Sequence, residues 1–333
     1  MKQKQKIILI TLSFFCLLGI IFLGIVILKG GQSLSIQGER ENLLRLQEGK
    51  KSPFSGLPCE NPNARAFAVD LAQYPETVPL SGLSQADIVI EGPVASPGGV
   101  TRLITIFQCQ SPLEIGSIRS VRPYMVDLAL GFDTIFASWG GAQTAINRIK
   151  NLGLDWLDGR VNPANAFFRK TNIPAPHNGF TSLERLKIAM KNLGMRETNQ
   201  FEGYQFFKGD EITFAKTDQE IKINYIYPVK YVYEPSSGDY LRFWNGQEMI
   251  DRNTSKQVKA KNVVILKTKI GTLSAGVVDV KIIGSGQATI YQAGKEIEGL
   301  WQKESSRAKL SFFNKEGREI KFVPGPIWIE ITS

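Results

Sequence analysis

Histidine and cysteine are scarce in this chain, which has 333 residues but only one histidine and three cysteines. A single histidine excludes a histidine-rich metal site, and three cysteines are too few for a disulfide-dense scaffold or a multi-cysteine zinc module. A largely disordered chain is excluded as well, because 43% of the residues are hydrophobic and 10% are aromatic. The length indicates about two domains with additional segments.

Several motifs of nucleotide-binding proteins and hydrolases are absent too. The sequence contains no P-loop, no G-x-G-x-x-G fingerprint, no G-x-S-x-G elbow and no D-x-D-x-D loop, and H-E-x-x-H would need two histidines. The triplet Gly284-Ser285-Gly286 lacks a third glycine and lies among predicted strands, so we interpret it as a turn. We therefore expect no cofactor and no metal centre.

The N-terminus contains a long uncharged run. Residues 7–28 form 22 residues without a charge, which is long enough to span a bilayer as a helix. Three lysines precede the run, so the positive-inside rule predicts a cytoplasmic N-terminus and an extracytoplasmic remainder. The run exceeds the apolar core of a usual signal peptide and ends without an A-x-A-like site. We expect an uncleaved single-pass anchor in the cell membrane over residues 1–29; a cleaved signal peptide, or a lipoprotein signal at Cys16, is the alternative.

The anchor changes what the charge and cysteine counts mean. Residues 1–29 hold four lysines and no acid, so the net charge falls from +9 to +5 over the rest of the chain. That remainder shows no basic stripe interleaved with aromatic residues, so we expect no nucleic-acid partner. Outside the anchor only Cys59 and Cys109 remain. Because paired cysteines in exported regions usually form disulfides, we predict a Cys59–Cys109 bond, with two buried free thiols as the alternative.

The rest of the chain divides into three segments. Residues 30–58 are polar and small and predict a stalk or linker. Residues 59–198 predict an α/β domain, because short apolar strands alternate with helical patterns. The strands are expected at 65–70, 86–91, 100–107 and 132–138, and the helices at 123–131, 142–152 and 181–193. Residues 199–333 contain many short alternating segments separated by turn signals, and predict a β-rich domain, a sandwich or an open barrel. The expected fold class is thus α+β behind one transmembrane helix.

Polar residues gather in the predicted loops of the first domain. Four arginines lie at or near strand ends, where they could clamp a phosphate or a carboxylate: Arg102, Arg119, Arg122 and Arg169. Strand ends and the loops that follow them host most binding sites of α/β domains. The alternative is that these arginines form surface ion pairs with Glu91, Asp127 and Asp158.

The single histidine lies in the string P-A-P-H-N-G. Two prolines rigidify the approach to His177, and Gly179 frees the exit, so the loop could present an imidazole and the Asn178 amide for acid–base chemistry. The alternative is a histidine that is simply hydrogen-bonded within its loop. The acid–base candidates beside it are Glu91 and Asp127.

Several strings along the chain form a specific set because of the order in which they occur. They include SGLSQADIVIEGPV (81–94), GGVTRLITIF (98–107), IGSIRSVRPYMVDLA (115–129), GSGQATIY (284–291) and PGPIWIEI (324–331). In this order they resemble the YerB-like family, over residues 54–333. The resemblance implies a bacterial envelope protein with two domains of unknown function and an association with peptidoglycan synthesis or remodelling. The family's polar signature falls here on Glu91, Thr101, Arg102, Arg119, Ser120, Arg122, Asp127, Arg169, His177 and Asn178.

The chain also departs from the family pattern. The lipidation cysteine typical of many members is missing, so the expected helix replaces the lipid. Leu71 follows Asp70 where the family has an Asp-Asn pair, and Met249 stands where a histidine is usual before Asp251. If that histidine serves chemistry in the family, this chain lacks it.

These observations together predict a membrane-anchored extracytoplasmic binding or accessory protein of the bacterial cell envelope, linked to peptidoglycan synthesis or remodelling. Its expected partner is an anionic envelope ligand, bound in an arginine-rich cleft, or a cell-wall synthesis protein. The alternative is an envelope hydrolase that uses Glu91 or Asp127 together with His177. The absence of a recognisable nucleophile or metal motif favours binding over catalysis. A third interpretation is a structural scaffold.

Overall fold

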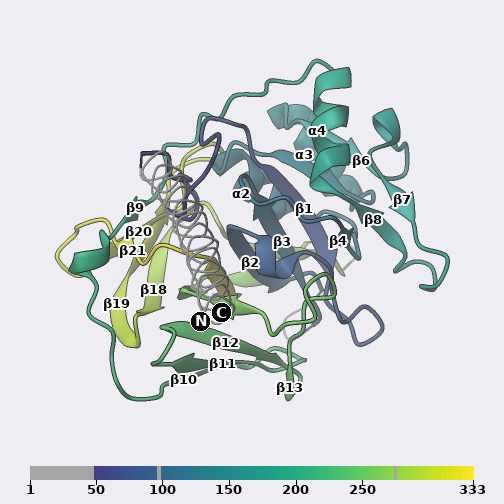
Figure 1. Cartoon of the computed structure of the whole chain (residues 1–333). Coiled ribbons are helices and arrows are strands. Elements are labelled where there is room, and N and C mark those ends of the chain that lie inside the picture. Colours follow the sequence, from purple (N-terminus) through teal and green to yellow (C-terminus); the bar gives the residue numbers. More distant parts are fainter. Residues whose placement is uncertain (1–48, 96–98, 274–275) are drawn as a thin grey trace, which may run out of the picture. The chain divides into compact units, whose positions relative to one another are not determined.

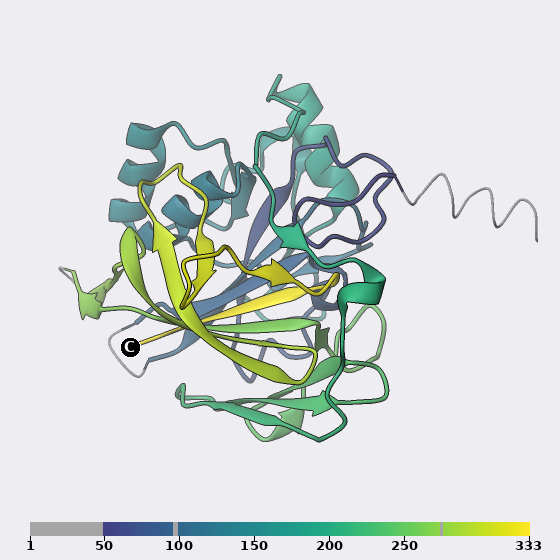
Figure 2. The same cartoon turned by 90° about the vertical axis from the view of Figure 1, so that its left-hand side faces the viewer.

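The computed structural model describes residues 49–95, 99–273 and 276–333. The predicted anchor over residues 7–28 and most of the predicted stalk lie outside the described residues. Within those ranges, no helix is long and apolar enough to cross a membrane. Residues 51–333 form one compact unit, which Figure 1 and Figure 2 show from two sides.

A ten-stranded sheet runs through the unit and takes strands from both predicted domains. Its order is β20 (Ser311–Asn314), β19 (Lys295–Lys303), β18 (Gly284–Gln292), β15 (Asn262–Lys267), β22 (Ile327–Thr332), β2 (Ile88–Pro93), β3 (Thr101–Phe107), β1 (Phe67–Ala72), β5 (Ile135–Ser138) and β6 (Trp156–Asp158). The two halves of the chain meet where β22 pairs in parallel with β2, from Ile88 opposite Ile327 to Glu91 opposite Glu330. The C-terminal strand therefore completes the hydrogen bonding of an N-terminal one.

Both faces of the large sheet are covered, which explains why its strands read as nearly continuous apolar runs. Along β1, Ala68 packs on the side of α2 (Pro123–Gly131) and α3 (Gln143–Leu152), which we call the helix face. Val69 and Leu71 pack on the opposite side, which α4 (Leu183–Asn192) and a second, smaller sheet cover and which we call the small-sheet face. Successive side chains point to opposite faces, as the pleat requires.

The smaller sheet contains β10 (Glu220–Ile223), β11 (Val229–Glu234), β12 (Asp239–Trp244), β13 (Gln247–Glu248) and β14 (Lys259–Ala260). Figure 1 and Figure 2 both show β10–β12 as a separate layer below the large sheet. Its strands alternate buried and accessible residues, so one face packs on the large sheet, where Tyr231 contacts Trp328 edge to face. The remaining short strands are β4 (Ile115–Gly116), β7 (Phe168–Arg169), β8 (Gly179–Thr181), β9 (Gln205–Phe206), β16 (Ile270–Thr272), β17 (Val278–Val280) and β21 (Lys321–Phe322).

Local signals set the helix ends as the sequence predicts. Pro123 occupies the first position of α2, where its missing N–H costs nothing. The hydroxyl of Ser182 accepts a hydrogen bond from the Arg185 N–H at the start of α4, and Gly153 ends α3 in the left-handed conformation with φ of 64°. All three predicted helices are confirmed to within two residues at each end.

The β-rich C-terminal half is confirmed, and its two sheets stack face to face, but they form no separate sandwich or open barrel. Its strands β15, β18, β19, β20 and β22 extend the sheet of the N-terminal half instead of closing on themselves. The triplet Gly284-Ser285-Gly286 starts strand β18 and is not a turn. Strand β19 escaped prediction because its first half, KEIEG, alternates only between partly and fully exposed residues and so carries no core pattern.

One buried cation joins the two sheets. Arg242 on β12 is fully buried and pairs with Glu91 on β2 and with Glu330 on β22, with 2.7 Å between Arg242 Nη1 and Glu330 Oε1. Its guanidinium carbon lies 4.2 Å from the ring centroid of Trp328, and its Nε donates to the sulfur of Met249 at 3.0 Å. Every donor edge of the guanidinium therefore faces a partner, as a buried charge requires.

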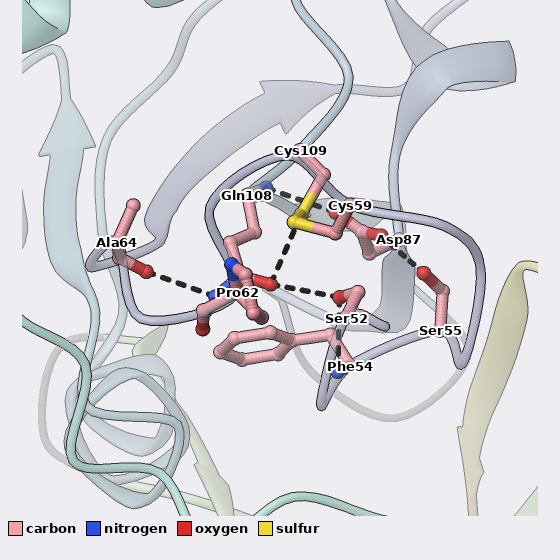
Figure 3. Close-up of a disulfide and its surroundings, with 9 residues drawn as sticks. All are labelled: Ser52, Phe54, Ser55, Cys59, Pro62, Ala64, Asp87, Gln108 and Cys109. Atoms are coloured by element: carbon pink, nitrogen blue, oxygen red, sulfur yellow. Dashed lines mark hydrogen bonds between the residues drawn. A yellow bond between two sulfur atoms is a disulfide. The ribbon is translucent and has the colours of Figure 1, made fainter. Parts of the chain in front are cut away.

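The predicted disulfide between Cys59 and Cys109 is confirmed, with 5.4 Å between the Cα atoms and 50 residues of sequence separation. Figure 3 shows that the same region is tied by hydrogen bonds. The side chain of Gln108 accepts from the Ser52 hydroxyl at 2.8 Å and donates to the Pro62 carbonyl at 2.7 Å. The bond and these contacts fasten residues 51–64 to the end of β3.

We expect removal of the disulfide by Cys59→Ala with Cys109→Ala to lower the free energy of unfolding by about 2–4 kcal/mol, because the reduced chain gains loop entropy when unfolded. Urea titration of oxidised wild type and of the double variant measures this loss. A reducing agent should bring the wild type to the level of the variant and leave the variant unchanged. Free thiols at both Cys59 and Cys109 in the oxidised protein, detected by mass spectrometry, would contradict the prediction.

We expect Arg242→Ala to lower the free energy of unfolding by about 3–5 kcal/mol, since it leaves two buried carboxylates without their cation. Arg318→Ala is the control, because Arg318 is exposed and its contact with Glu316 is 3.8 Å long. That exposed pair should contribute less than about 1 kcal/mol. Similar losses for the two variants in urea titration would show that Arg242 does not hold the sheets together.

Candidate functional site

Three of the four predicted arginines meet on the helix face, beside Asp70. Arg102 lies on β3, opposite Ala72 of β1, and points to the same face as Asp70 because both occupy positions of equal parity in the paired strands. The loop between β4 and α2 supplies Arg119 and Arg122. This loop is fixed to β1, since the Arg119 N–H donates to the Asp70 carbonyl at 2.9 Å.

The side chains of these three arginines donate their hydrogen bonds to backbone carbonyls. Arg102 and Arg122 both donate to the carbonyl of Ser120, Arg122 from Nη1 at 3.0 Å, and Arg119 donates to the Pro176 carbonyl at 3.2 Å. Within the described part of the chain, Asp70 is the one carboxylate within 4.0 Å of any of them, at 3.7 Å from Arg102 Nη1. Three guanidinium groups thus face a single carboxyl group, which leaves an excess of positive charge.

Asp70 is fully buried, and burial raises the pKa of its carboxyl from 3.8 to about 7, against the opposing effect of Arg102, Arg122 and Arg119. Neither of its oxygens accepts a hydrogen bond from the described residues. A buried carboxyl without hydrogen bonds is unusual, because most buried polar side chains have a partner.

The neighbouring arginines are affected by the same crowding. Burial, and next the charge of Arg102, lower the pKa of Arg122 to about 10. Burial and Arg102 also lower the pKa of Arg119. Arg119 and Arg122 are only half-buried. Their mutual repulsion would be relieved by an anion placed between them.

His177 lies beside this cluster. Its pKa is lowered by burial and then by Arg119, so the imidazole is neutral at neutral pH. The ring lies 5.9 Å from that of Tyr74, and the His177 carbonyl accepts the Ser117 hydroxyl at 2.5 Å. Nδ1 of the ring is buried and has no hydrogen-bond partner among the described residues.

The site therefore contains unused donors and unused acceptors together. In the described part of the chain, the buried side-chain atoms without a partner include both carboxyl oxygens of Asp70, Nε of Arg102, Nε of Arg119 and Nδ1 of His177. Each such group calls for a partner, either water or a ligand. We refer to Asp70, Arg102, Arg119, Arg122 and His177 as the arginine site.

The fourth predicted arginine, Arg169, belongs to a different hollow. It donates to the side chain of Asn178 at 2.5 Å, and its guanidinium carbon lies 4.2 Å from the ring centroid of Trp139. That hollow has a volume of about 500 Å³ and is lined by Trp139, Gly159, Arg160, Asn162, Phe167, Phe168 and Arg169. None of the other three arginines lines it, so the four do not form one shared cleft.

Of the remaining predicted binding residues, Ser120 contributes a backbone carbonyl and Thr101 points away. The Thr101 hydroxyl donates to Glu91 at 2.5 Å on the small-sheet face, whereas its neighbour Arg102 lies on the helix face. This separation follows from the pleat, which directs adjacent side chains to opposite sides.

Glu91 and Asp127 are both held in ion pairs. Glu91 is fully buried against Arg242, and Asp127 forms a two-point pair with Arg148 at 2.7 and 2.9 Å. The expected alternative of pairing with the candidate arginines is also wrong, because Glu91, Asp127 and Asp158 pair with Arg242, Arg148 and Arg160. Both carboxyl groups are thus buried and engaged by arginines other than the four predicted ones.

Sequence reasoning missed Asp70 as a site residue, as well as Arg242 and Glu330 as the centre of the core. The available signal was a charged residue inside an apolar strand, as in FAVDLA, DYLRFW and IWIEIT. Such a residue must be paired or functional, because an isolated buried charge is costly. Over the ranges that the structure describes, no three acidic, histidine or cysteine side chains are grouped to hold a metal ion.

Comparisons with known proteins cover both halves of the chain. Residues 54–196 match the family described as "Protein of unknown function (DUF3048) N-terminal domain", and residues 220–329 match the corresponding C-terminal domain. A relative from Bacillus subtilis (strain 168), "Putative lipoprotein YerB", is 31% identical over 293 residues, covering 85% of this chain and 86% of the relative. The crystal structure of the YerB protein from Bacillus subtilis covers 85% of this chain and 96% of its own, with a TM-score of 0.76 and 30% identity.

We expect the protein to lose stability as the pH rises from about 4 to about 7. Burial, and then repulsion by Glu330, raise the pKa of Glu91 from 4.5 to about 7. Burial also raises the pKa of Asp70, from 3.8 to about 7. At a pH between the pKa of a group in the unfolded state and its pKa in the folded state, the folded state holds more protons. The free energy of unfolding therefore falls by up to about 1.4 kcal/mol per pH unit for each group. At a pH below the unfolded-state pKa values, the full stabilisation by these two groups is present.

Urea titrations across that pH range test the expectation. Glu91→Gln should flatten the slope by about the contribution of one proton, because the amide does not titrate. Glu298→Gln is the control, since Glu298 is exposed on β19 and its pKa is lowered by the side-chain hydrogen bond from Lys315. A slope that is the same in wild type and Glu91→Gln would show that Glu91 does not hold the extra proton.

Proposed function

The chain belongs to the YerB-like family of paired DUF3048 domains, and from that premise we propose a membrane-anchored, extracytoplasmic accessory protein of the bacterial cell envelope. In this proposal it binds an anionic envelope ligand through Arg102, Arg119 and Arg122, and it serves peptidoglycan synthesis or remodelling. The resemblance that the sequence motifs predicted is thereby confirmed for the family, and the ligand and the process are the proposed part.

Three observations support an extracytoplasmic place. The uncharged run over residues 7–28 has the length of a membrane-spanning helix and follows three lysines. Cys59 and Cys109 form a disulfide, which persists mainly in oxidising compartments. The related Bacillus subtilis protein carries the name of a lipoprotein. A lipid anchor and a helical anchor would keep the same body at the same membrane surface.

The observation that carries anion binding is the excess of cationic groups in the arginine site. Among the described residues, the side chains of Arg119 and Arg122 donate only to backbone carbonyls and are half-buried, so no described carboxylate neutralises their charge. Guanidinium groups of this kind bind carboxylate or phosphate with two parallel hydrogen bonds. Partial burial strengthens such contacts, because the local dielectric constant is lower than in water.

The hydrolase alternative receives less support from the geometry. A general acid or base must lie within hydrogen-bond reach of the proton that it transfers. Glu91 is enclosed between the two sheets with Arg242, and Asp127 is engaged by Arg148. Among the described residues, Nδ1 of His177 has no hydrogen-bond partner, and the carboxylate that acts on the pKa of His177 is Glu76, which lies outside the arginine site.

We expect the protein to sediment with purified peptidoglycan sacculi, and Arg119→Ala with Arg122→Ala to weaken this binding at least tenfold, since each lost charged hydrogen bond contributes about 1.5–3 kcal/mol. The full chain in detergent micelles is used, with bound protein measured against sacculus concentration. Arg307→Ala with Arg318→Ala is the matched control, because both residues are exposed and the net charge changes equally.

Equal weakening by the two double variants would mean that only net charge matters, and the arginine site would be rejected. Urea titration of each variant verifies that folding is retained. Turnover of sacculus fragments that is lost in His177→Ala would favour the hydrolase over the accessory protein.

A further inference from the structure

The geometry points to an anion that brings its own hydrogen-bond donor, namely a phosphate that keeps a proton, as the ligand of the arginine site, in preference to fully ionised anions such as sulfate. This inference rests on the proposed anion binding and adds the chemical class of the anion. Asp70 is the residue that distinguishes a protonated phosphate from a fully ionised anion.

The argument starts from the mixture of unused groups. Nε of Arg102 and Nε of Arg119 are donors that need an acceptor, whereas the two oxygens of Asp70 are acceptors that need a donor. These groups belong to one cluster, since Arg102, Arg119 and Arg122 are the charges that act on Asp70. A ligand that satisfies the whole cluster must therefore accept hydrogen bonds on one side and donate one on the other.

A sulfate or a plain carboxylate meets only half of this requirement. Its oxygens can accept hydrogen bonds from the arginines, but they cannot donate one to the oxygens of Asp70. Two sets of acceptor oxygens would then face each other and repel. Leaving a buried charged acceptor unsatisfied costs more than an ordinary hydrogen bond contributes. A phosphate with one P–OH group accepts from the arginines and donates to Asp70, so every group finds a partner.

A zwitterion such as an amino acid also combines hydrogen-bond acceptors with a donor, but its net charge differs from that of phosphate. The arginine site holds three guanidinium groups against one carboxyl, and His177 is neutral because burial and Arg119 lower its pKa. An amino acid has no net charge and leaves this excess unchanged, whereas a phosphate brings one or two negative charges. The electrostatic balance therefore favours phosphate.

The groups that face Asp70 come from three elements. Arg102 lies on β3, Arg119 and Arg122 lie on the loop before α2, and Tyr124 lies on α2. Burial, and then Asp70, raise the pKa of the Tyr124 hydroxyl, so the phenol stays protonated. No second carboxylate competes for the arginines at this place in the described chain.

A phosphate would approach this cluster from the side of Arg119 and Arg122, because Asp70 and Arg102 are buried. Both side chains are half-buried, and the described residues hold each of them by carbonyls, so turning them toward a ligand breaks hydrogen bonds to neutral acceptors. Oδ2 of Asp70 lies 3.7 Å from Arg102 Nη1, which is longer than a hydrogen bond, and neither carboxyl oxygen accepts a hydrogen bond from the described residues.

The shared proton makes the selection depend on pH. Below about pH 7, Asp70 itself carries a proton that it can donate to any anion. Above that pH, Asp70 is ionised, and hydrogen phosphate still brings a proton while sulfate does not. Phosphate monoesters lose their second proton near pH 6, so they bind as monoanions or share the proton of Asp70.

The test is a calorimetric titration of the full chain in detergent micelles with inorganic phosphate and with sodium sulfate at about pH 8 and equal ionic strength. We expect phosphate to bind at least tenfold more tightly than sulfate, as a charged hydrogen bond of about 1.5–3 kcal/mol implies. In Asp70→Asn the two anions should differ by less than about twofold, because the amide supplies a donor of its own and carries no charge.

The outcomes separate this inference from the proposed function. If neither anion binds, and glucose 1-phosphate does not bind at about pH 6 either, anion binding itself is overturned. Equal affinities in wild type would overturn the selection by Asp70 and leave anion binding standing. A phosphate preference that survives in Asp70→Asn would overturn the role of Asp70.

Wild type alone also tests the inference if Asp70→Asn does not fold. The ratio of phosphate to sulfate affinity should rise between about pH 6 and about pH 8, by up to tenfold per pH unit above the pKa of Asp70. A ratio that does not change with pH overturns the proposal. Comparing inorganic phosphate with glucose 1-phosphate at about pH 6 then distinguishes free phosphate from a sugar monoester as the source of the bound group.

Discussion

The buried guanidinium of Arg242 is the contact on which the architecture depends. It belongs to β12 of the small sheet, and its two carboxylate partners, Glu91 and Glu330, belong to adjacent strands of the large sheet. A charge in this position is tolerated only when it is fully paired, so the small sheet can dock in one register. The family domains over residues 54–196 and 220–329 are therefore interdependent, since Glu91 lies in one and Arg242 in the other.

The same network reaches the strand ends beside the arginine site. The Gln73 side chain donates to Glu91 at 3.0 Å, and the Thr101 hydroxyl donates to it as well. These hydrogen bonds connect the ends of β1, β2 and β3 on the small-sheet face. Arg102 follows Thr101 directly and points to the opposite face. The position of the binding groups is thus set by rigid strands and a fixed core, and not by the loops alone.

Features encoded by neighbouring residues could be predicted from the sequence. The helices follow from caps and spacing, and the strand that ends at Phe107 follows from its apolar run. The Cys59–Cys109 bond follows because these are the two cysteines of the sequence outside the predicted anchor. Features that depend on distant residues could not be predicted: the pairing of β22 with β2, the partner of Arg242, and the separation of Arg169 from the other arginines. A charged residue within an apolar strand signals burial, but it does not identify the partner.

Two buried carboxyl groups with raised pKa values illustrate why similar chemistry serves different roles here. Asp70 and Glu91 lie two strands apart, yet they point to opposite faces of the large sheet, because their positions differ in parity along the paired strands. On the small-sheet face, Glu91 meets Arg242, Thr101 and Gln73, and its hydrogen bonds are complete. On the helix face, Asp70 meets half-buried arginines that are held only by carbonyls, and its oxygens are unused. A group that is completely satisfied by the protein has no capacity left for a ligand. The unsatisfied group is therefore where binding specificity can arise, and the pleat of one sheet is what keeps the two apart.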